Sequence, residues 1–162
     1  MAQIRVVVYG ASGRVGCEVV RAATEDPDTV LAGAVDIKTT GERLTLPDGS
    51  GSVPFSSDLA AIIDSCKPDV IVDFTIAKAS MPALRISAPR GVRTVIGATG
   101  FSPADFDEMK KLAEDNNTGI FVAPNFALGA VLMMHLAKIA GKYFDHAEIV
   151  ELHHDRKLDA AS

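Results

Sequence analysis

The sequence predicts an α/β protein built on a parallel β-sheet, and three observations support this fold class. Short runs rich in β-branched residues alternate with longer helical patterns along the whole chain. The first run, residues 4–9, is typical of a central parallel strand that is covered on both faces. A glycine-rich turn and a helix follow it directly, and no internal repeat interrupts the alternation.

The first half of the chain predicts two strands and a helix, followed by a loop. The helix covers about residues 14–23 and ends before Asp26-Pro27, because the residue before a proline disfavours helical angles. The second strand spans residues 30–35 and ends at Asp36. Residues 38–58 are polar and rich in turn formers, so we expect a surface loop with at most one short strand.

The second half continues the alternation of strands and helices. Ser80 and Pro82 resemble a helix start, with serine as the cap and proline in the first turn, and Ser102-Pro103 marks another start. Gly141 is a natural helix stop. We expect short strands at residues 69–74, 93–96, 120–122 and 147–152, and helices at residues 59–65, 103–115 and 128–140.

Composition limits the classes of function that the chain can serve. The 162 residues are 48% hydrophobic, which is enough to bury one core and to begin a second. The formal net charge is -5, and apart from those in the C-terminal stretch the basic residues, 16 in the whole chain, are scattered. We therefore expect no nucleic-acid partner. No apolar run approaches the ~20 residues of a membrane span. Cys17 and Cys66 lack metal-ligand spacing, so we expect reduced thiols and a cytoplasmic location.

The glycine-rich turn is the first chemical motif. It has the spacing G-x-x-G-x-x-G and consists of Gly10, Ala11, Ser12, Gly13, Arg14, Val15 and Gly16. Glycines let the backbone N–H groups at a helix N-terminus approach a pyrophosphate closely. An ordinary tight turn between a strand and a helix would use the same residues. The preceding strand and the following helix favour a Rossmann-like dinucleotide cradle.

Asp36 strengthens this interpretation. It closes the second strand about 20 residues after the turn, where an acid accepts hydrogen bonds from the adenosine ribose hydroxyls. Its negative charge disfavours the 2′-phosphate of NADPH, whereas Lys38 and Arg14 can tolerate one. The sequence therefore predicts NADH or NADPH as the cofactor, with NADH favoured on charge.

Three further segments follow predicted strands, at the carboxyl ends where open α/β sheets bind their ligands. They are Phe74-Thr75, Gly97-Ala98-Thr99-Gly100 and Ala123-Pro124-Asn125-Phe126. Gly97 and Gly100 would let the backbone approach the nicotinamide ribose, and Asn125 could bond the carboxamide. Each segment could also be an ordinary turn between a strand and a helix.

The C-terminal stretch 151–162 concentrates histidines, basic residues and carboxylates. Alternation along a strand would place His153 and His154 on opposite faces, so we expect different roles for them. A histidine can supply a proton near neutral pH, and Lys157 can offer a fixed positive charge to a developing anion. A solvated strand end is the alternative. A zinc site is disfavoured because no third strong ligand is evident, so we expect no metal.

These motifs together resemble the 4-hydroxy-tetrahydrodipicolinate reductase family, also called dihydrodipicolinate reductase. The resemblance covers the whole chain and is most specific in the C-terminal stretch, Glu151-Leu-His-His-Asp-Arg-Lys-Leu-Asp-Ala-Ala-Ser162. It implies NAD(P)H-dependent reduction of a small dicarboxylate, 4-hydroxy-tetrahydrodipicolinate, to tetrahydrodipicolinate with loss of water, in diaminopimelate and lysine biosynthesis. His153 then matches the proton donor and acceptor, Lys157 the second catalytic residue, and His154 a substrate contact.

The resemblance also implies the cofactor segments and the domain organisation. Residues 10–15, Asp36, residues 97–99 and residues 123–126 match the family's cofactor contacts. Residues 1–127 would form the dinucleotide-binding domain, and residues 128–162 would begin an α+β domain for substrate binding and oligomerisation. Family members carry roughly a hundred further residues that support a homotetramer, so we expect a truncated chain. Ala161 and Ala98 replace residues that are more usual in the family, a proline and a threonine.

Two other functions stay open at this level. The chain could be a nucleotide-binding fragment or sensor that binds NADH without turnover. It could also be a related oxidoreductase that acts on another amino-acid-like substrate, although the C-terminal histidine and lysine pattern argues against this alternative.

Overall fold

The computed structural model of the chain describes residues 2–39 and 41–150. Within these ranges the strands are β1 (Ile4–Tyr9), β2 (Thr29–Val35), β3 (Arg43–Thr45), β4 (Ser52–Ser56), β5 (Val70–Asp73), β6 (Arg93–Ile96) and β7 (Ile120–Val122). The helices are α1 (Arg14–Glu25), α2 (Leu59–Cys66), α3 (Ala77–Ser87), α4 (Pro103–Asp115) and α5 (Leu128–Ala140), with a 3-10 turn, η1 (Ala88–Arg90).

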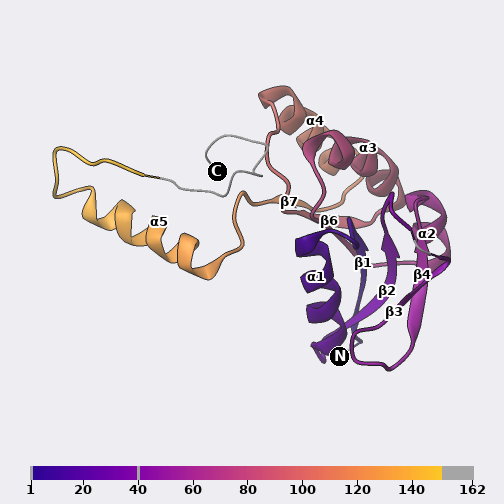
Figure 1. Cartoon of the computed structure of the whole chain (residues 1–162). Helices are drawn as coiled ribbons and strands as arrows, with labels where there is room; N and C mark the ends of the chain where they lie inside the picture. Colours follow the sequence, from indigo (N-terminus) through magenta and orange to yellow (C-terminus); the bar gives the residue numbers. More distant parts are fainter. Residues whose placement is uncertain (1, 40, 151–162) are drawn as a thin grey trace. The chain divides into compact units, whose positions relative to one another are not determined.

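The strands form a seven-stranded sheet in the order β3-β4-β2-β1-β5-β6-β7 (Figure 1). All neighbouring pairs are parallel except β3 and β4, which pair antiparallel. β1 lies between β2 and β5, so the chain turns back across the sheet at this point. The predicted α/β class with a Rossmann-like parallel sheet is confirmed.

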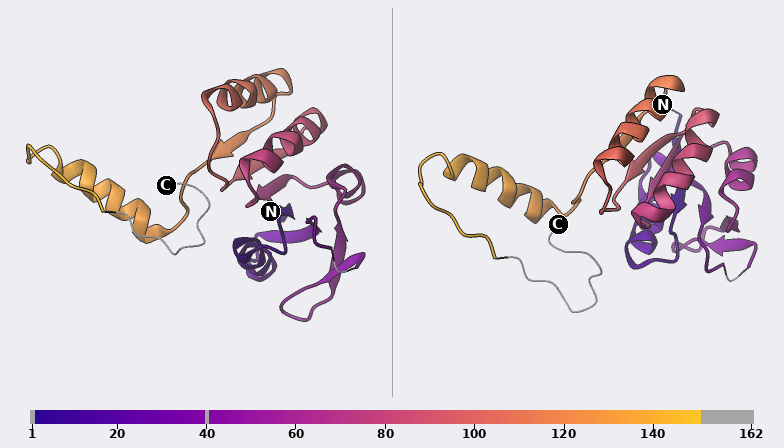
Figure 2. Two further views of the ribbon diagram at one scale, coloured as in Figure 1. Left: turned by 45° about the horizontal axis from the view of Figure 1, so that its top comes forward. Right: turned by 90° about the horizontal axis from the view of Figure 1, so that it is seen from above.

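Helices cover both faces of the sheet, and alternate residues of β1 point to opposite faces. Val6 and Val8 pack in one apolar cluster with Val20 of α1, whereas Val7 packs in a second cluster with Ile62 of α2. Figure 2 shows α1 on one side of the strands and α2, α3 and α4 on the other. The uninterrupted apolar run of residues 6–8 is therefore explained by a strand that is buried on both faces.

The segment 38–58 forms more regular structure than the sequence predicted. It contains two strands, β3 and β4, instead of a loop with at most one short strand. Val53 and Phe55 point into the core and anchor β4 beside β2, while the turn-forming residues 46–51 connect the pair. The turn-rich composition concealed this hairpin because only two of its side chains are buried apolar residues.

The predicted start of the third helix is wrong by one turn. α3 begins at Ala77, and Ser80 lies within it, completely buried, with its hydroxyl donating to the carbonyl of Ile76 at 3.2 Å. Pro82 is also inside the helix. Good helix-forming residues before Ser80 extend the helix towards its N-terminus, and this tendency outweighs the capping preference of serine. α4 has the predicted bounds, and α1 extends to Glu25, slightly past the predicted end near residue 23 but still before Asp26-Pro27 as predicted.

The chain divides into two compact units, Met1–Val122 and Ala123–Ser162. The domain boundary expected between residues 127 and 128 stays a prediction. In the second unit, α5 has the predicted bounds, with Gly141 as the C-cap residue that follows it, and it contains no buried residue. The strand predicted at residues 147–152 is wrong for its described part, residues 147–150, which are not in a strand. A strand needs a hydrogen-bonding neighbour, and the described part of this unit offers none.

No helix in the described part of the chain is long and apolar enough to cross a membrane.

Candidate functional site

The carboxyl ends of three central strands meet at one edge of the sheet in the first unit. Tyr9 of β1 is in register with Val35 of β2 and with Asp73 of β5. The loops that follow β1 and β5 lead to α1 and α3, which lie on opposite faces (Figure 1). A crevice opens where connections diverge in this way, and it is the usual ligand site of open α/β sheets.

The glycine-rich turn after β1 is fixed by close backbone contacts. Gly10 has a φ of +87°, and a Cβ atom there would lie 2.8 Å from the methyl group of Thr75. At Gly16 a Cβ atom would lie 1.9 Å from the carbonyl oxygen of Gly10, which holds α1 against the end of β1. Only glycine fits these two positions, so close packing of the backbone fixes the conformation of the turn beside the crevice.

The N-terminus of α1 carries no side-chain cap. Gly13 is the N-cap residue, and the first turn of the helix contains no acidic side chain. By contrast, Ser102 and Asp105 form a capping box at the start of α4. Backbone N–H groups in the first turn of α1 precede the first helical bond, from Cys17 to Gly13, and need an external acceptor. An anion such as a pyrophosphate fits that need.

Asp36 is held beside this turn by backbone hydrogen bonds. Its Oδ2 atom accepts the N–H of Ser12 at 2.9 Å, and its Oδ1 atom accepts the N–H of Lys38 at 2.9 Å. The side chain is 9% exposed. Each carboxylate oxygen has a further lone pair, so Asp36 can still accept hydrogen bonds from the hydroxyls of a bound ribose.

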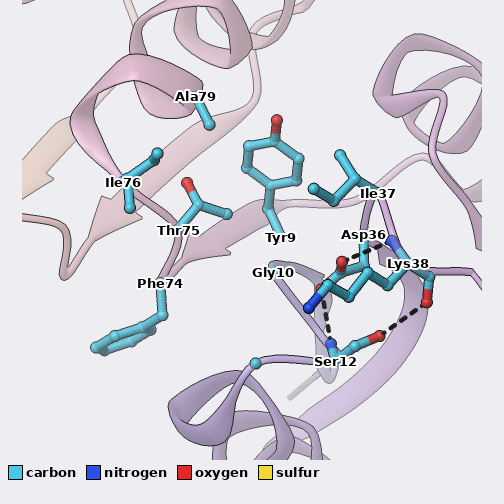
Figure 3. Close-up of a pocket in the computed structure, with 11 residues that line it drawn as sticks. Tyr9, Gly10, Ser12, Asp36, Ile37, Lys38, Phe74, Thr75, Ile76 and Ala79 are labelled. Carbon is cyan, nitrogen blue, oxygen red and sulfur yellow. Dashed lines mark hydrogen bonds between the residues drawn. The ribbon is translucent and has the colours of Figure 1, made fainter. Parts of the chain in front are cut away.

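A cavity of about 330 Å³ lies between the loops that follow β1, β2 and β5 (Figure 3). It is mostly apolar, and Asp36 and Lys38 supply charge at its lining. The residues that line it are Tyr9, Gly10, Ser12, Gly13, Asp36, Ile37, Lys38, Phe74, Thr75, Ile76 and Ala79. A cavity that combines an apolar wall with a few placed polar groups suits a small organic ligand.

Asp73 fixes the loop after β5. Its Oδ1 atom accepts both the backbone N–H of Thr75, at 2.8 Å, and the Thr75 hydroxyl, at 2.6 Å. Burial raises the pKa of Asp73, and the polar groups of Ser80 and Thr75 oppose that shift only in part. Asp73 is 1% exposed, so it shapes the cavity through Thr75 without lining it.

The structure brings together only some of the residues predicted to contact a cofactor. Gly10, Ser12, Gly13 and Asp36 line the cavity, whereas Ala11, Arg14 and Val15 belong to the same turn and helix start without lining it. For all of these residues, a cofactor contact stays a prediction.

The segment Gly97-Ala98-Thr99 follows β6 at the same edge of the sheet. The ring of Phe74 occupies the space beside Gly97, where a Cβ atom would lie 2.2 Å from it. The Ala98 side chain is buried in the cluster between α3 and α4, so only its backbone is available to a ligand. These three residues do not line the cavity, and their predicted cofactor contacts are not tested.

The remaining predicted residues lie elsewhere in the chain. Ala123, Pro124, Asn125 and Phe126 belong to the second unit, where Asn125 accepts the backbone N–H of Ala127 at 2.8 Å. The catalytic and substrate residues His153, His154 and Lys157 lie outside the described residues. Within residues 2–39 and 41–150, no three His, Cys, Asp or Glu side chains gather to hold a metal.

Sequence reasoning did not identify four of the residues that line the cavity: Tyr9, Ile37, Ile76 and Ala79. Each lies next to, or within four residues of, a position that the sequence did identify at a strand end. Tyr9 ends a buried strand, where apolar residues are ordinarily assigned to the core, whereas Ile37, Ile76 and Ala79 lie beyond the strand ends and belong to no motif.

The sheet order, the glycine turn and the carboxylate after β2 define a Rossmann-like α/β domain with the architecture of nucleotide-binding domains. Residues 4–126 match the family model described as dihydrodipicolinate reductase, N-terminus. The chain belongs to the dihydrodipicolinate reductase family.

Curated relatives match over the whole chain. A 4-hydroxy-tetrahydrodipicolinate reductase of Dehalococcoides mccartyi is 54% identical over 162 residues, which are 100% of this chain and 62% of that protein. The corresponding enzyme of Moorella thermoacetica is 46% identical and is covered over 61% of its length. The chain thus spans about three fifths of the length of these relatives.

Solved structures agree with the family. A dipicolinate-bound dihydrodipicolinate reductase from Paenisporosarcina sp. TG-14 has a TM-score of 0.80 and 39% identity, and it covers 99% of this chain and 62% of its own. Homoserine dehydrogenase of S. aureus is 16% identical with a TM-score of 0.61, so it shares only the fold.

Proposed function

We propose that this chain acts as a 4-hydroxy-tetrahydrodipicolinate reductase, which uses NAD(P)H to reduce 4-hydroxy-tetrahydrodipicolinate to tetrahydrodipicolinate, with loss of water, in diaminopimelate and lysine biosynthesis. The 54% identity to a named reductase across all 162 residues carries this proposal. The dipicolinate bound to the Paenisporosarcina relative supports a small heterocyclic dicarboxylate as the substrate class.

The residues present fit a pyridine nucleotide. The uncapped N-terminus of α1 and the turn at residues 10–15 would hold the pyrophosphate, and Asp36 would accept the adenosine ribose hydroxyls. When bound, NAD(P)H supplies the hydride. Residues 97–99 and 123–126 are proposed to contact the nicotinamide half.

The chemistry proposed for the C-terminal stretch rests on residue types. His153 would protonate the ring position where electron density collects after hydride transfer, and Lys157 would neutralise the developing charge. His154 would contact a substrate carboxylate. In a chain of net charge -5, this local group of basic residues offers a dianionic substrate a favourable electrostatic environment.

We propose NADH as the favoured cofactor and NADPH as tolerated. The Asp36 carboxylate repels a 2′-phosphate, but Lys38 lines the same cavity and its backbone is fixed by Asp36. We also propose a cytoplasmic location, where free thiols such as those of Cys17 and Cys66 stay reduced. From the family resemblance we propose a homotetramer, and from the net charge of -5 we propose no nucleic-acid partner. We propose no membrane partner either.

The decisive experiment replaces His153 in a version of the protein extended to the length of its relatives. We expect His153→Ala to lower kcat by about 10²-fold or more while the Kd for NADH changes less than twofold, because a general acid acts in the chemical step. Unchanged turnover would contradict the acid role. Binding of NADH without any turnover by the parent protein would favour the sensor alternative.

Asp36 provides a separate test of the cofactor site. Asp36→Ala should weaken NADH binding more than NADPH binding, because it removes a ribose acceptor and also the repulsion of the 2′-phosphate. Calorimetric titration with each cofactor measures both effects. Equal losses for the two cofactors would exclude the proposed contact with the ribose.

A further inference from the structure

Tyr9 occupies an unusual place in the cavity. It is the last residue of β1 and directly precedes Gly10, so it lies at the floor of the crevice. Its ring packs against the apolar cluster beneath α2 and α3, and it also lines the cavity. Figure 3 shows the ring between Thr75 and Ala79 on one side and Ile37 on the other, with its hydroxyl directed away from the Gly10 turn.

The cavity around this ring has the chemistry of a site for a flat heterocycle. Ile37 contributes apolar surface from the loop after β2, and Ile76 and Ala79 contribute it from the start of α3. Asp36, the proposed ribose acceptor, lines the same cavity. A base attached to a ribose at Asp36 would therefore enter the part of the cavity that contains Tyr9.

The Tyr9 hydroxyl is suited to donate a hydrogen bond. Burial raises its pKa, and the nearby carboxylates of Asp73 and Asp36 raise it further. The phenol thus keeps its proton at neutral pH. The ring nitrogens of adenine are hydrogen-bond acceptors, so the two groups are complementary.

We infer that Tyr9 is a base-binding residue of this chain: its ring contacts the adenine of the dinucleotide, and its hydroxyl donates to an adenine ring nitrogen. This inference rests on the proposed use of a pyridine nucleotide. It assigns to Tyr9 a role that adds to the contacts of the glycine turn and of Asp36. It also explains why a phenol, and not an aliphatic residue, ends a strand whose preceding positions are valines.

The composition of the chain allows the fluorescence of Tyr9 to report on ligand binding. The 162 residues contain no tryptophan and two tyrosines, Tyr9 and Tyr143. Tyr143 lies in the second unit with its side chain exposed, so Tyr143→Phe is a matched control that leaves Tyr9 as the single source of tyrosine emission. In this variant we expect ADP-ribose to change the emission saturably, whereas nicotinamide mononucleotide should not.

The second arm removes the hydroxyl alone. We expect Tyr9→Phe to weaken the binding of NADH and of ADP-ribose by about 2- to 10-fold, as for a typical hydrogen bond, and to leave nicotinamide mononucleotide unaffected. Isothermal titration measures these affinities, and Tyr143→Phe should match the parent chain. If Tyr9→Phe fails to fold, the emission experiment still decides, because it keeps Tyr9 intact.

The outcomes separate this inference from the proposed function. If the parent chain binds NADH but Tyr9 emission does not respond to ADP-ribose, Tyr9 does not contact the base. An emission response with unchanged affinities in Tyr9→Phe would exclude the hydrogen bond and so overturn the inference as stated. Failure of the parent chain to bind NADH or NADPH would contradict both the inference and the proposed cofactor.

Discussion

Asp73 illustrates how a single residue can shape the site without lining it. Its Oδ1 atom accepts hydrogen bonds from the backbone N–H and the hydroxyl of Thr75. Thr75 in turn lines the cavity, and its methyl group lies close to Gly10. Within the described residues its Oδ2 atom is buried without a hydrogen-bond partner. A buried carboxylate in this state favours its proton, because desolvation penalises the charged form.

This environment predicts a dependence of stability on pH. The pKa of Asp73 is raised in the folded chain, so between the unfolded pKa of about 4 and the higher folded pKa the folded chain keeps a proton that the unfolded chain has released. The contribution of Asp73 to the free energy of unfolding should therefore fall as the pH rises through this window. Asp73→Asn removes the titration and keeps an acceptor for Thr75, so its stability relative to the parent should increase with pH.

Urea unfolding followed by circular dichroism at several pH values measures this difference. Asp107→Asn is the control, since it removes the same formal charge from an exposed position on α4. A constant difference between Asp73→Asn and the parent across the window would show that Asp73 does not titrate there.

At the scale of residues, the sequence predicted those members of the site whose positions a motif constrains. Gly10, Gly13 and Asp36 follow from spacing, because a turn and a strand end fix their places. Tyr9 and Ile76 could not be predicted, since their place beside the cavity depends on how β1 aligns with β5, the strand that precedes Ile76. That alignment is a property of the folded sheet and leaves no local pattern in the sequence.

At the scale of elements, the contact of α1 with β1 controls the shape of the crevice. Gly16 is the second residue after Arg14 in α1, and it lies directly against the carbonyl oxygen of Gly10. In an exposed helix, replacing glycine with alanine adds about 1 kcal/mol of stability. Here the 1.9 Å approach to backbone reverses the sign, because neither the strand nor the helix start can move without losing hydrogen bonds.

Gly16→Ala is therefore expected to lower the free energy of unfolding by about 1–3 kcal/mol, as overpacking does in other cores. Urea unfolding followed by far-UV circular dichroism measures the change. Gly41→Ala is the matched control, because a Cβ atom there meets nothing within 4 Å, and it should change stability by less than about 0.5 kcal/mol. Equal stabilities for the two variants would mean that α1 tolerates displacement from β1.

The success of element prediction followed the strength of local signals. α4 begins with a capping box and a proline, and its start was predicted from these residues, while its end was predicted from the Asn116-Asn117 pair and Gly119. The sequence allowed one short strand in residues 38–58 but did not locate β4, because a turn-rich segment surrounds its two buried side chains, Val53 and Phe55. Whether such a strand forms depends on a partner, here β2, that is distant in the sequence.

At the scale of the whole molecule, the two units differ in how much apolar surface they bury. In the described part of the chain, the three core clusters all lie in the first unit, whereas no residue of α5 in the second unit is buried. The large apolar side chains that α5 exposes are Leu128, Val131, Leu132, Met133, Met134, Leu136 and Ile139. Most helical stability in proteins comes from packing an apolar face, and an isolated helix of this length is marginal in water.

Hydrogen exchange should therefore separate α5 from α4 in the 162-residue chain. The two helices are matched in length at 13 residues each, but α4 packs Met109 and Leu112 into a core cluster. We expect the amides of α5 to exchange at least about tenfold faster than those of α4, because local opening of α5 loses no buried contact. Mass spectrometry of peptides from both helices measures the ratio. Comparable protection at low protein concentration would contradict this expectation, and protection that grows with concentration would show that a second copy covers the apolar face of α5.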